Sequence, residues 1–345
     1  MTDGIVLGFG AAGLAAGVAF LLCMIAIKAR FGLDPVSERS SHTAPTPRTG
    51  GLMVLASVVV VALVLSAFGA MPPRVTTLLA LVVGAGAIGL IDDFLKLAAP
   101  VKLVGQTGLA TFAVLVLGPV QSIPLPLLGW TDAPTAFAMA LSAFWLVAIM
   151  NVVNFMDGLN GLVASYAIVA LAAAPMMLGE PVFLLFAVQG ALFGFLLVNG
   201  FSGRIFLGDA GSLSLGFLLG AVPLVGGQGS HAFWLMPLVV LPLIADVAVT
   251  LVRRALRGAD LSEAHREHAY QLLKADGWSH QAVATAVLVT GVAAVAISAV
   301  LGDPDKASPT AYWLAALAIG AIWLAGVAVM RFLKSGRVSL ERSLR

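Results

Sequence analysis

Long apolar runs separated by short polar segments dominate this chain of 345 residues. Eleven runs come close to the roughly 20 residues that a helix needs to cross a bilayer. The runs do not alternate with period two, so the pattern predicts an all-α integral membrane protein in one domain, residues 1–345, and not a membrane barrel. The expected spans are roughly 4–27, 51–70, 75–91, 101–119, 135–153, 159–178, 181–199, 211–226, 231–252, 280–301 and 310–333.

Composition narrows the class of protein further. Only 10% of the residues are charged and 60% are hydrophobic, whereas soluble domains carry about 25% charged residues. This excludes an ordinary cytosolic enzyme, a disordered chain and a nucleic-acid binder, so we expect no nucleic acid among the partners. The single cysteine, Cys23, excludes a disulfide or cysteine–metal framework.

The charges that remain are distributed unevenly between the two sets of connecting segments. One set holds 17 of the 19 basic residues, and the other holds only Arg74 and Lys306. Because basic loops stay in the cytoplasm, we expect the N-terminus outside and the C-terminus inside, in agreement with an odd number of spans. Twelve of the 17 acidic residues also fall on or near the cytoplasmic side.

The first polar motif on that side is the pair Asp92-Asp93 at the end of an apolar run, followed by Lys96 and Lys102. Neighbouring residues on a helix diverge by about 100°, so the two carboxylates need not share a ligand. Acids beside lysines suit a divalent cation with a phosphate, because Mg²⁺ takes one or two carboxylates together with phosphate oxygens and water. For such a pair taken alone, a solvated helix end with a local salt bridge is the better explanation.

The second motif is Asn151-Val152-Val153-Asn154-Phe155-Met156-Asp157-Gly158-Leu159-Asn160-Gly161, between two strongly apolar spans. Asn151, Asn154 and Asp157 are three residues apart and share a helix face. The glycines allow a tight turn and a close approach to a ligand. A plain turn is the alternative, but the length of the polar run makes it the weaker interpretation.

The third motif runs from Asn199 to Ser212 and contains Arg204 and Asp209 among glycines. A glycine-rich loop that leads into a helix can present backbone N–H groups to an anion. Asp209 is a candidate metal ligand and Arg204 a candidate phosphate contact. An N-cap role explains Asp209 equally well.

The fourth motif, His265-Arg266-Glu267-His268-Ala269-Tyr270-Gln271, lies in the longest cytoplasmic loop. The H-x-x-H spacing places both imidazoles on one helix face, but no third ligand follows with the spacing of a zinc site. A contact to phosphate or sugar therefore fits better than zinc, with two exposed loop histidines as the alternative.

Two further features lie on the same side. Segment 39–51 is a stiff basic loop that could contact a lipid phosphate through Arg48 or only enforce topology. Asp246 lies within an apolar span, where an ionisable residue is a functional candidate. A structural hydrogen bond to a neighbouring helix is nearly as good an explanation of Asp246.

Taken together, the motifs resemble those of the polyprenyl-phosphate N-acetylhexosamine-1-phosphate transferases, from about Arg39 to about Val283. The family pattern has a Pro-Thr-Pro-Arg-x-Gly-Gly loop, an Asp-Asp pair, Asn-x-x-Asn-x-x-Asp-Gly, Phe-Met-Gly-Asp-x-Gly-Ser and a late histidine motif. Here these are Pro45 to Gly51, Asp92-Asp93, Asn151 to Gly158, Phe206 to Ser212 with Asn199, and His265 to His268. The form His-x-x-His-x-Tyr-Gln is more similar to the branch that initiates O-antigen and related surface glycans than to the phospho-N-acetylmuramoyl-pentapeptide transferases, which stay as the alternative. The family often has a second Asp where this chain has Asn160, so no metal role is assigned to Asn160.

The resemblance implies a reaction in the bacterial inner membrane, at its cytoplasmic face. A polyprenyl phosphate such as undecaprenyl phosphate attacks a UDP-N-acetylhexosamine, giving polyprenyl-diphosphate-sugar and UMP, with Mg²⁺ as cofactor and Mn²⁺ as a substitute. Direct attack is favoured over a covalent aspartyl intermediate, because a phosphate monoester with a second pKa of about 6 needs little help from a base. Membrane lipid is a further partner, and a homodimer is compatible with the sequence. The expected catalytic residues are Asp92, Asp93, Asp209, His265 and His268; the expected metal ligands are Asp209 and Asp93; the expected substrate-binding residues are Arg48, Lys102, Asn151, Asn154, Asp157, Asn199 and Arg204.

Two other classes of function compete with this interpretation. A transporter or lipid flippase would place charged groups near the midplane within broken helices. A membrane scaffold without catalysis would not need the Asp-Asp and Gly-Asp-x-Gly-Ser elements.

Overall fold

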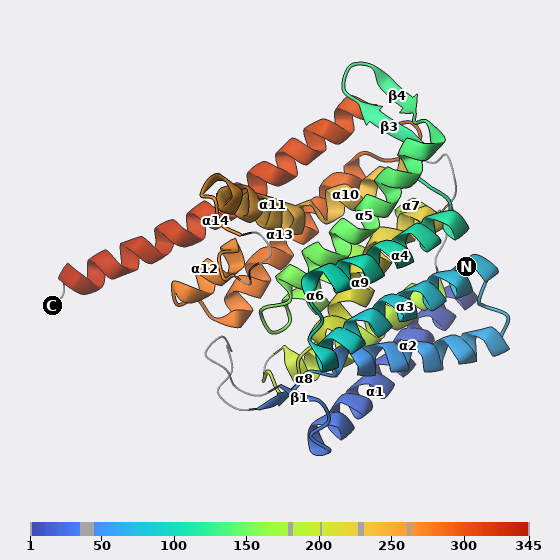
Figure 1. Ribbon diagram of the computed structural model, residues 1–345, viewed down its shortest axis with the longest axis horizontal. Coiled ribbons are helices and arrows are strands. Elements are labelled where there is room, and N and C mark those ends of the chain that lie inside the picture. The colour runs from blue at the N-terminus through green and yellow to red at the C-terminus, as the bar shows by residue number, and fades with distance from the viewer. Residues whose placement is uncertain are drawn as a thin grey trace.

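A computed structural model describes residues 2–34, 45–178, 182–200, 202–226, 231–260, 263 and 265–343. Part of the basic loop, with Arg39 and His42, lies outside these ranges. The described chain is a bundle of helices with the N-terminus at one end and the C-terminal helix projecting at the other (Figure 1). The helices are α1 (Thr2–Lys28), α2 (Gly50–Ala67), α3 (Pro73–Leu95), α4 (Ala99–Leu117), α5 (Thr135–Met156), α6 (Leu162–Leu171), α7 (Ala174–Leu178), α8 (Phe183–Asn199), α9 (Gly208–Val225), α10 (Leu235–Val239), α11 (Leu241–Leu256), α12 (Ala269–Ala275), α13 (His280–Val300) and α14 (Pro309–Ser343), with a 3₁₀ turn η1 (His231–Trp234) before α10.

The protein is thus an all-α membrane protein, as the apolar runs predicted. Eight described helices are long and apolar enough to cross a membrane, and nine if α10 and α11, which meet at a 64° bend, form one span. The sequence predicted eleven crossing runs. The other two runs contain shorter helices, because the sixth is divided between α6 and α7 and the seventh, α8, has 17 residues.

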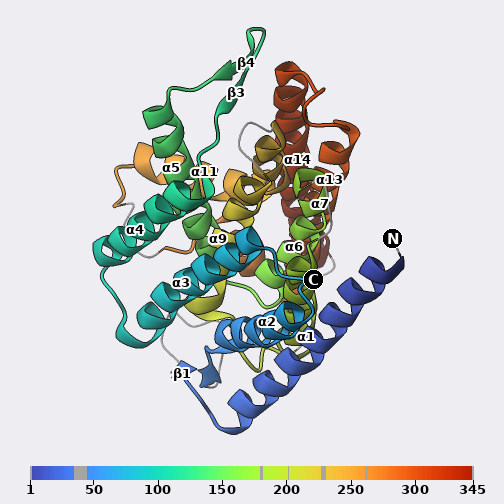
Figure 2. The ribbon, with the colours of Figure 1, turned by 90° about the vertical axis from the view of Figure 1, so that its right-hand side faces the viewer.

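Two small antiparallel sheets complete the fold and were not anticipated from the hydropathy pattern. Strands β1 (Leu33–Asp34) and β2 (Thr46–Pro47) pair at the end of α1. Strands β3 (Ser122–Leu125) and β4 (Gly129–Asp132) form a hairpin at the opposite end of the bundle, seen at the top of Figure 2. Such short strands, in segments rich in proline and glycine, cannot be detected with a 20-residue hydropathy window.

Helix α9 forms the centre of the bundle. Every residue from Gly208 to Leu224 is buried, and α9 packs against α2, α3, α5, α6 and α7. A helix that is apolar on all sides belongs in such an interior position. Its first residues, which include Asp209, are therefore held by neighbours on several sides.

Small residues allow the closest helix contacts. Gly190 and Gly194 of α8 lie against the backbone of Ala12 and Ala16 of α1, so a side chain at either glycine would meet a carbonyl oxygen. This spacing of small residues is a common way for membrane helices to approach one another.

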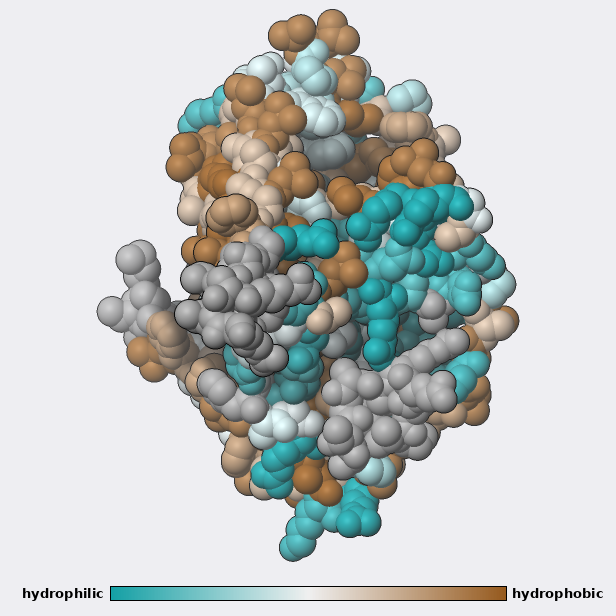
Figure 3. All heavy atoms as spheres, turned by 90° about the vertical axis from the view of Figure 1, so that its left-hand side faces the viewer, coloured by the Kyte–Doolittle hydropathy of each residue, from teal (hydrophilic) through white to brown (hydrophobic). Residues whose placement is uncertain are grey.

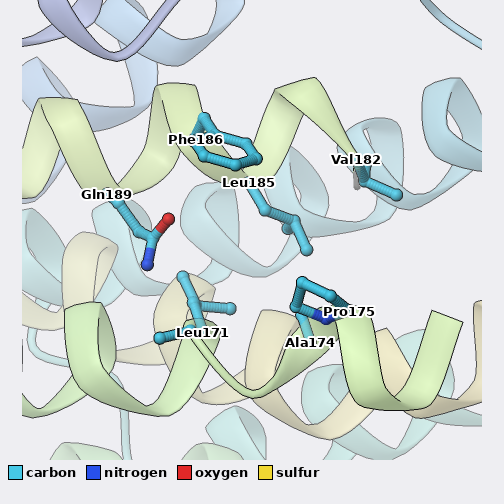
Figure 4. Close-up of a pocket in the computed structure, with 8 residues that line it drawn as sticks. Leu171, Ala174, Pro175, Val182, Leu185, Phe186 and Gln189 are labelled. Carbon is cyan, nitrogen blue, oxygen red and sulfur yellow. The ribbon is translucent and has the colours of Figure 1, made fainter. Parts of the chain in front are cut away.

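An apolar pocket lies between α8 and the α6–α7 break (Figure 4). Its walls include Leu171, Pro175, Leu185 and Phe186, and the one polar side chain among its described lining residues is Gln189, whose Nε2 donates to the Ile168 carbonyl at 2.9 Å. No ionisable side chain within the described ranges lines it, whereas several meet at the polar end of the bundle.

Candidate active site

Hydrophilic residues gather at the end of the bundle opposite the β3–β4 hairpin (Figure 3). There the segment after β2 is bonded to the loop before α9. The amides of Gly50 and Gly51 donate to the carbonyls of Phe206 and Leu207 at 2.8 and 2.7 Å. Gly51 lies directly against the backbone of Gly211, with no space for a side chain. This contact brings Arg48 beside Asp209, although 161 residues separate them.

Asp93 holds the start of α9 from the other side. Its Oδ1 accepts the amide of Asp209 and its Oδ2 accepts the amide of Ala210, both at 3.0 Å. Gly89, one turn earlier on α3, lies against the Asp209 backbone. A carboxylate at a helix N-terminus satisfies amides that have no partner within the helix and interacts favourably with the helix dipole.

Lys102 lies at the centre of a cage of oxygen atoms. Its Nζ is 2.6 Å from Asp209 Oδ2, 2.8 Å from Asp92 Oδ2 and 3.3 Å from Asn154 Oδ1. An ammonium has three donors, and each has one acceptor here. Asn154 is held in turn by its Nδ2, which donates to Ser212 Oγ at 2.9 Å. Helices α3, α4, α5 and α9 thus meet around one cationic group.

Arg48 completes an alternating network of charges. Its Nη2 is 2.8 Å from Asp209 Oδ1, and its Nε is 3.1 Å from Asp93 Oδ1. Although burial opposes the charged form, the attraction of Asp209 and Asp93 leaves the pKa of Arg48 above its ordinary value. A cavity reaches this part of the network, and its wall includes Arg48 and Lys96.

These contacts allow a test of which residues could hold Mg²⁺. In the described part of the chain no three His, Cys, Asp or Glu side chains form a ready metal site. Mg²⁺ needs only one or two carboxylates, and Asp92 and Asp209 already direct oxygen atoms at the same cation, the Lys102 ammonium. Both oxygens of Asp93 are occupied by amides, so Asp93 fits a metal ligand less well than Asp92 does.

The histidines form a second cluster, around the start of α12. The His265 and His268 rings lie 4.9 Å apart, and His268 is 5.9 Å from the Phe155 ring. Burial and the neighbouring His268 and Arg254 lower the pKa of His265. The Tyr270 hydroxyl donates to the Phe155 carbonyl at 2.8 Å, which docks α12 against the segment that follows Asn154.

Asp157 lies between the two clusters. Desolvation, together with the nearby Asp209 and Asp93, raises its pKa well above the ordinary value against the opposing effect of Arg48. Its side chain has no hydrogen-bond partner among the residues that the structure describes. Because burial disfavours its charged form, this carboxyl group takes up a proton more readily than an exposed one, and when protonated it can donate a hydrogen bond.

Some residues predicted for the site are engaged elsewhere. Asn199 Oδ1 accepts the Gly161 amide and its Nδ2 donates to the Ile205 carbonyl, both at 2.7 Å, so Asn199 joins two loops. Asn151 Nδ2 donates to Gln106 Oε1 on α4 at 2.8 Å. Arg204 is exposed, and no ion pair to it occurs within the described ranges.

The sequence analysis did not single out three residues that the structure brings to this region: Gln106, Ser212 and Tyr270. Gln106 is fully buried within α4, and a polar side chain inside an apolar run was a signal that could have marked it. Ser212 and Tyr270 stand inside recognised motifs, but their roles depend on contacts with distant segments.

Comparison with known proteins supports a common ancestry for this arrangement. Residues 75–227 match the family model "Glycosyl transferase family 4". A "Probable undecaprenyl-phosphate N-acetylglucosaminyl 1-phosphate transferase" of Bacillus subtilis is 31% identical over 276 residues, covering 75% of this chain and 74% of the relative. A "Decaprenyl-phosphate N-acetylglucosaminephosphotransferase" of Mycolicibacterium smegmatis is 32% identical, covering 78% and 75%. A "Phospho-N-acetylmuramoyl-pentapeptide-transferase" of Halalkalibacterium halodurans is 30% identical, covering 72% and 80%.

Proposed function

Because the chain belongs to glycosyl transferase family 4 and is a multi-pass membrane phosphotransferase of the polyprenyl-phosphate N-acetylhexosamine-1-phosphate transferase type, we propose that it initiates a lipid-linked surface glycan. The phosphate oxygen of a polyprenyl phosphate, undecaprenyl phosphate in many bacteria, attacks the sugar-linked phosphorus of a UDP-N-acetylhexosamine. The bond from that phosphorus to the bridging oxygen of the diphosphate breaks, and UMP leaves.

The observation that carries the proposal is the Lys102 ammonium held between Asp92 and Asp209. Two anionic substrates repel each other, and a site for their reaction must offset this repulsion. Arg48 and Lys102 face Asp92, Asp93 and Asp209, so these five groups carry one more negative than positive charge. One divalent cation would make the same set net positive.

Asp209 and Asp92 would hold Mg²⁺, or Mn²⁺ in its place. The ion would offset the charge of the diphosphate while the two phosphates meet. Lys102 and Arg48, which face these carboxylates, would bind phosphate oxygens of the two substrates. Asp93 keeps the amides at the start of α9 in position, and thereby Asp209.

We favour direct attack by the lipid phosphate over a covalent aspartyl intermediate. The second pKa of a phosphate monoester is about 6, so it is largely dianionic at neutral pH. All four carboxylate oxygens of Asp92 and Asp93 accept hydrogen bonds, Asp92 from the Leu97 amide and Lys102. A nucleophilic carboxylate would first have to lose one of these partners.

The UDP-sugar is assigned to the side formed by Asn154, Asp157, His265 and His268. Asp157 would contact the nucleotide or sugar, and the histidines would contact the diphosphate or sugar. Arg204, on an exposed loop, is assigned to the same ligand, whereas Asn151 joins α5 to α4 and Asn199 supports the loops around the site.

We further propose that all eleven apolar runs cross the membrane, with α6 and α7 as one span, and α10 and α11 as another. The N-terminus then lies outside, and the site faces the cytoplasm of a bacterial inner membrane. The concentration of basic residues at the end that carries the site supports this orientation.

The test is a panel of donors with purified protein, Mg²⁺ and undecaprenyl phosphate. UDP-N-acetylglucosamine, its 6-deoxy relatives and UDP-N-acetylmuramoyl-pentapeptide are supplied one at a time, and UMP is measured. We expect UMP from an N-acetylhexosamine donor and none from the pentapeptide. Release from the pentapeptide alone would instead assign the chain to the peptidoglycan branch.

A further inference from the structure

Asp246 of α11 makes more contacts than a buried acid needs for stability alone. Its side chain is 2% exposed. Its Oδ1 accepts the Ala269 amide at 2.9 Å and lies 3.3 Å from His268 Nδ1, and its Oδ2 accepts the Tyr270 amide at 3.2 Å. One carboxylate therefore holds both backbone and side-chain donors at the first turn of α12.

The contact to His268 fixes the position of the ring proton. A carboxylate oxygen can only accept, so the ring nitrogen that faces it, Nδ1, must carry hydrogen. His268 Nε2 is buried without a hydrogen-bond partner in the described part of the chain. A bare Nε2 avoids a buried donor with no acceptor, so the ring adopts the tautomer protonated at Nδ1.

The second backbone contact of Asp246 is to Tyr270, whose side chain packs against the active site. The Tyr270 hydroxyl donates to the Phe155 carbonyl at 2.8 Å, and its ring lies directly against Gly158. Phe155 and Gly158 flank the stretch that contains Asp157. A chain of contacts thus leads from Asp246, through α12, to the loop assigned to the UDP-sugar.

We propose that Asp246 is a positioning residue of the transferase. It sets the tautomer of His268, so that Nε2 is an acceptor, and it holds α12 against the loop at Asp157. The inference rests on the proposed function, because that function assigns His268 and Asp157 to the UDP-sugar side. Asp246 itself touches neither substrate.

Asp246→Asn disturbs both effects with almost no change in shape. An amide offers one acceptor oxygen and one NH₂ donor where the carboxylate offers two acceptors. With the oxygen toward Tyr270, the NH₂ group faces His268 Nδ1, which must then accept, so the ring proton moves to Nε2, and the Ala269 amide loses its acceptor. With the oxygen toward His268 and Ala269, the Tyr270 amide loses its acceptor instead. Either orientation loosens the start of α12, and the first also changes the His268 tautomer.

The first measurement needs no activity. Nitrogen NMR of histidine-labelled protein at about pH 8, above the ordinary imidazole pKa of about 6.5, distinguishes protonated from bare ring nitrogens. The His268 signal is identified by its loss in His268→Gln. We expect proton-bearing Nδ1 and bare Nε2 in the natural protein, and a shift toward proton-bearing Nε2 in Asp246→Asn. A proton on Nε2 in the natural protein would overturn the proposal, whether or not Asp246→Asn folds.

The second measurement is kinetic, with Asp276→Asn as the matched control at the opposite end of α12. We expect Asp246→Asn to lose about 10- to 100-fold in kcat/KM for the UDP-sugar, as misplacement near a reacting group does. KM for the lipid phosphate should stay within twofold. A loss no greater than that of Asp276→Asn, or an equal loss for both substrates, would contradict a positioning role.

The proposed function and the role of Asp246 can fail separately. If the natural protein releases no UMP with any donor, the proposed reaction is wrong. The NMR measurement of the His268 tautomer does not depend on activity and still tests the contact with Asp246.

Discussion

At the scale of single residues, the network around Asp209 assigns different roles to acids that look alike in sequence. Asp92 shares a cation with Asp209, whereas Asp93 is bound to amides at the start of α9. Both acids were identified from the sequence, but the sequence does not tell which of them binds the cation and which binds the amides. Helical spacing shows that the side chains of Asp92 and Asp93 point in different directions, but not which distant segments they contact. Asp246 illustrates the same limit, because its partners lie over 20 residues away.

The role of Asp209 can be tested by one substitution. Asp209→Asn keeps the shape but removes the charge that faces Lys102 and Arg48, so we expect UMP release to fall by roughly 10²- to 10³-fold, as when one charge-stabilising group is removed. The Mg²⁺ concentration for half-maximal rate should rise. Asp303→Asn, on an exposed loop, is the control. Near-normal activity of Asp209→Asn in folded protein would exclude it as a metal ligand.

At the scale of elements, hydropathy was a good guide to where helices lie and a poor guide to how they are divided. Every expected run contains helix, yet the α6–α7 break and the α10–α11 bend occur inside continuous apolar stretches. A proline stands at the start of the helix that follows each break, Pro175 in α7 and Pro242 in α11, and a proline cannot continue the preceding helix without loss of a hydrogen bond. The motif glycines were informative, since Gly51 and Gly89 lie where α2 and α3 approach α9.

The close approach of α2 and α9 makes a prediction about packing. In Gly51→Ala the added methyl group would overlap Gly211, so the helices must separate and Asp209 must shift. We expect unfolding at lower temperature, with a loss of about 1–3 kcal/mol, and a lower rate of UMP release. Gly108→Ala on α4 is the matched control, because nothing lies within 4 Å of its new methyl group. Equal thermal midpoints in the two variants would show that the α2–α9 contact is not tight.

At the scale of the whole molecule, the two ends of the bundle differ in chemistry. One end carries the charge network and the cluster of His265 and His268. The other carries the β3–β4 hairpin, where Trp130 stacks on His231 and Leu127 is 92% exposed. Charge asymmetry in the sequence predicted that charged groups gather at one end, because in a chain with few charges they are confined to places where they act or contact water.

The proposed orientation can be measured with single cysteines. Cys23 is fully buried, so the natural protein should react little with a maleimide that cannot cross membranes. We expect Leu127→Cys to be labelled in intact cells with a permeable outer envelope, and Glu263→Cys only after the inner membrane is opened. The reverse pattern would invert the topology and move the site to the outer face.

The central claim is that this site moves a sugar together with its phosphate. It is tested most directly with UDP-N-acetylglucosamine, or the donor selected by the panel, labelled with ³²P in the phosphate that bears the sugar. With undecaprenyl phosphate and Mg²⁺, the label should pass into the organic-soluble lipid while unlabelled UMP is released, and Asp209→Asn should abolish most of the transfer. Label that stays in water as UDP, while the sugar moves to the lipid, would contradict a phosphotransferase and indicate simple glycosyl transfer.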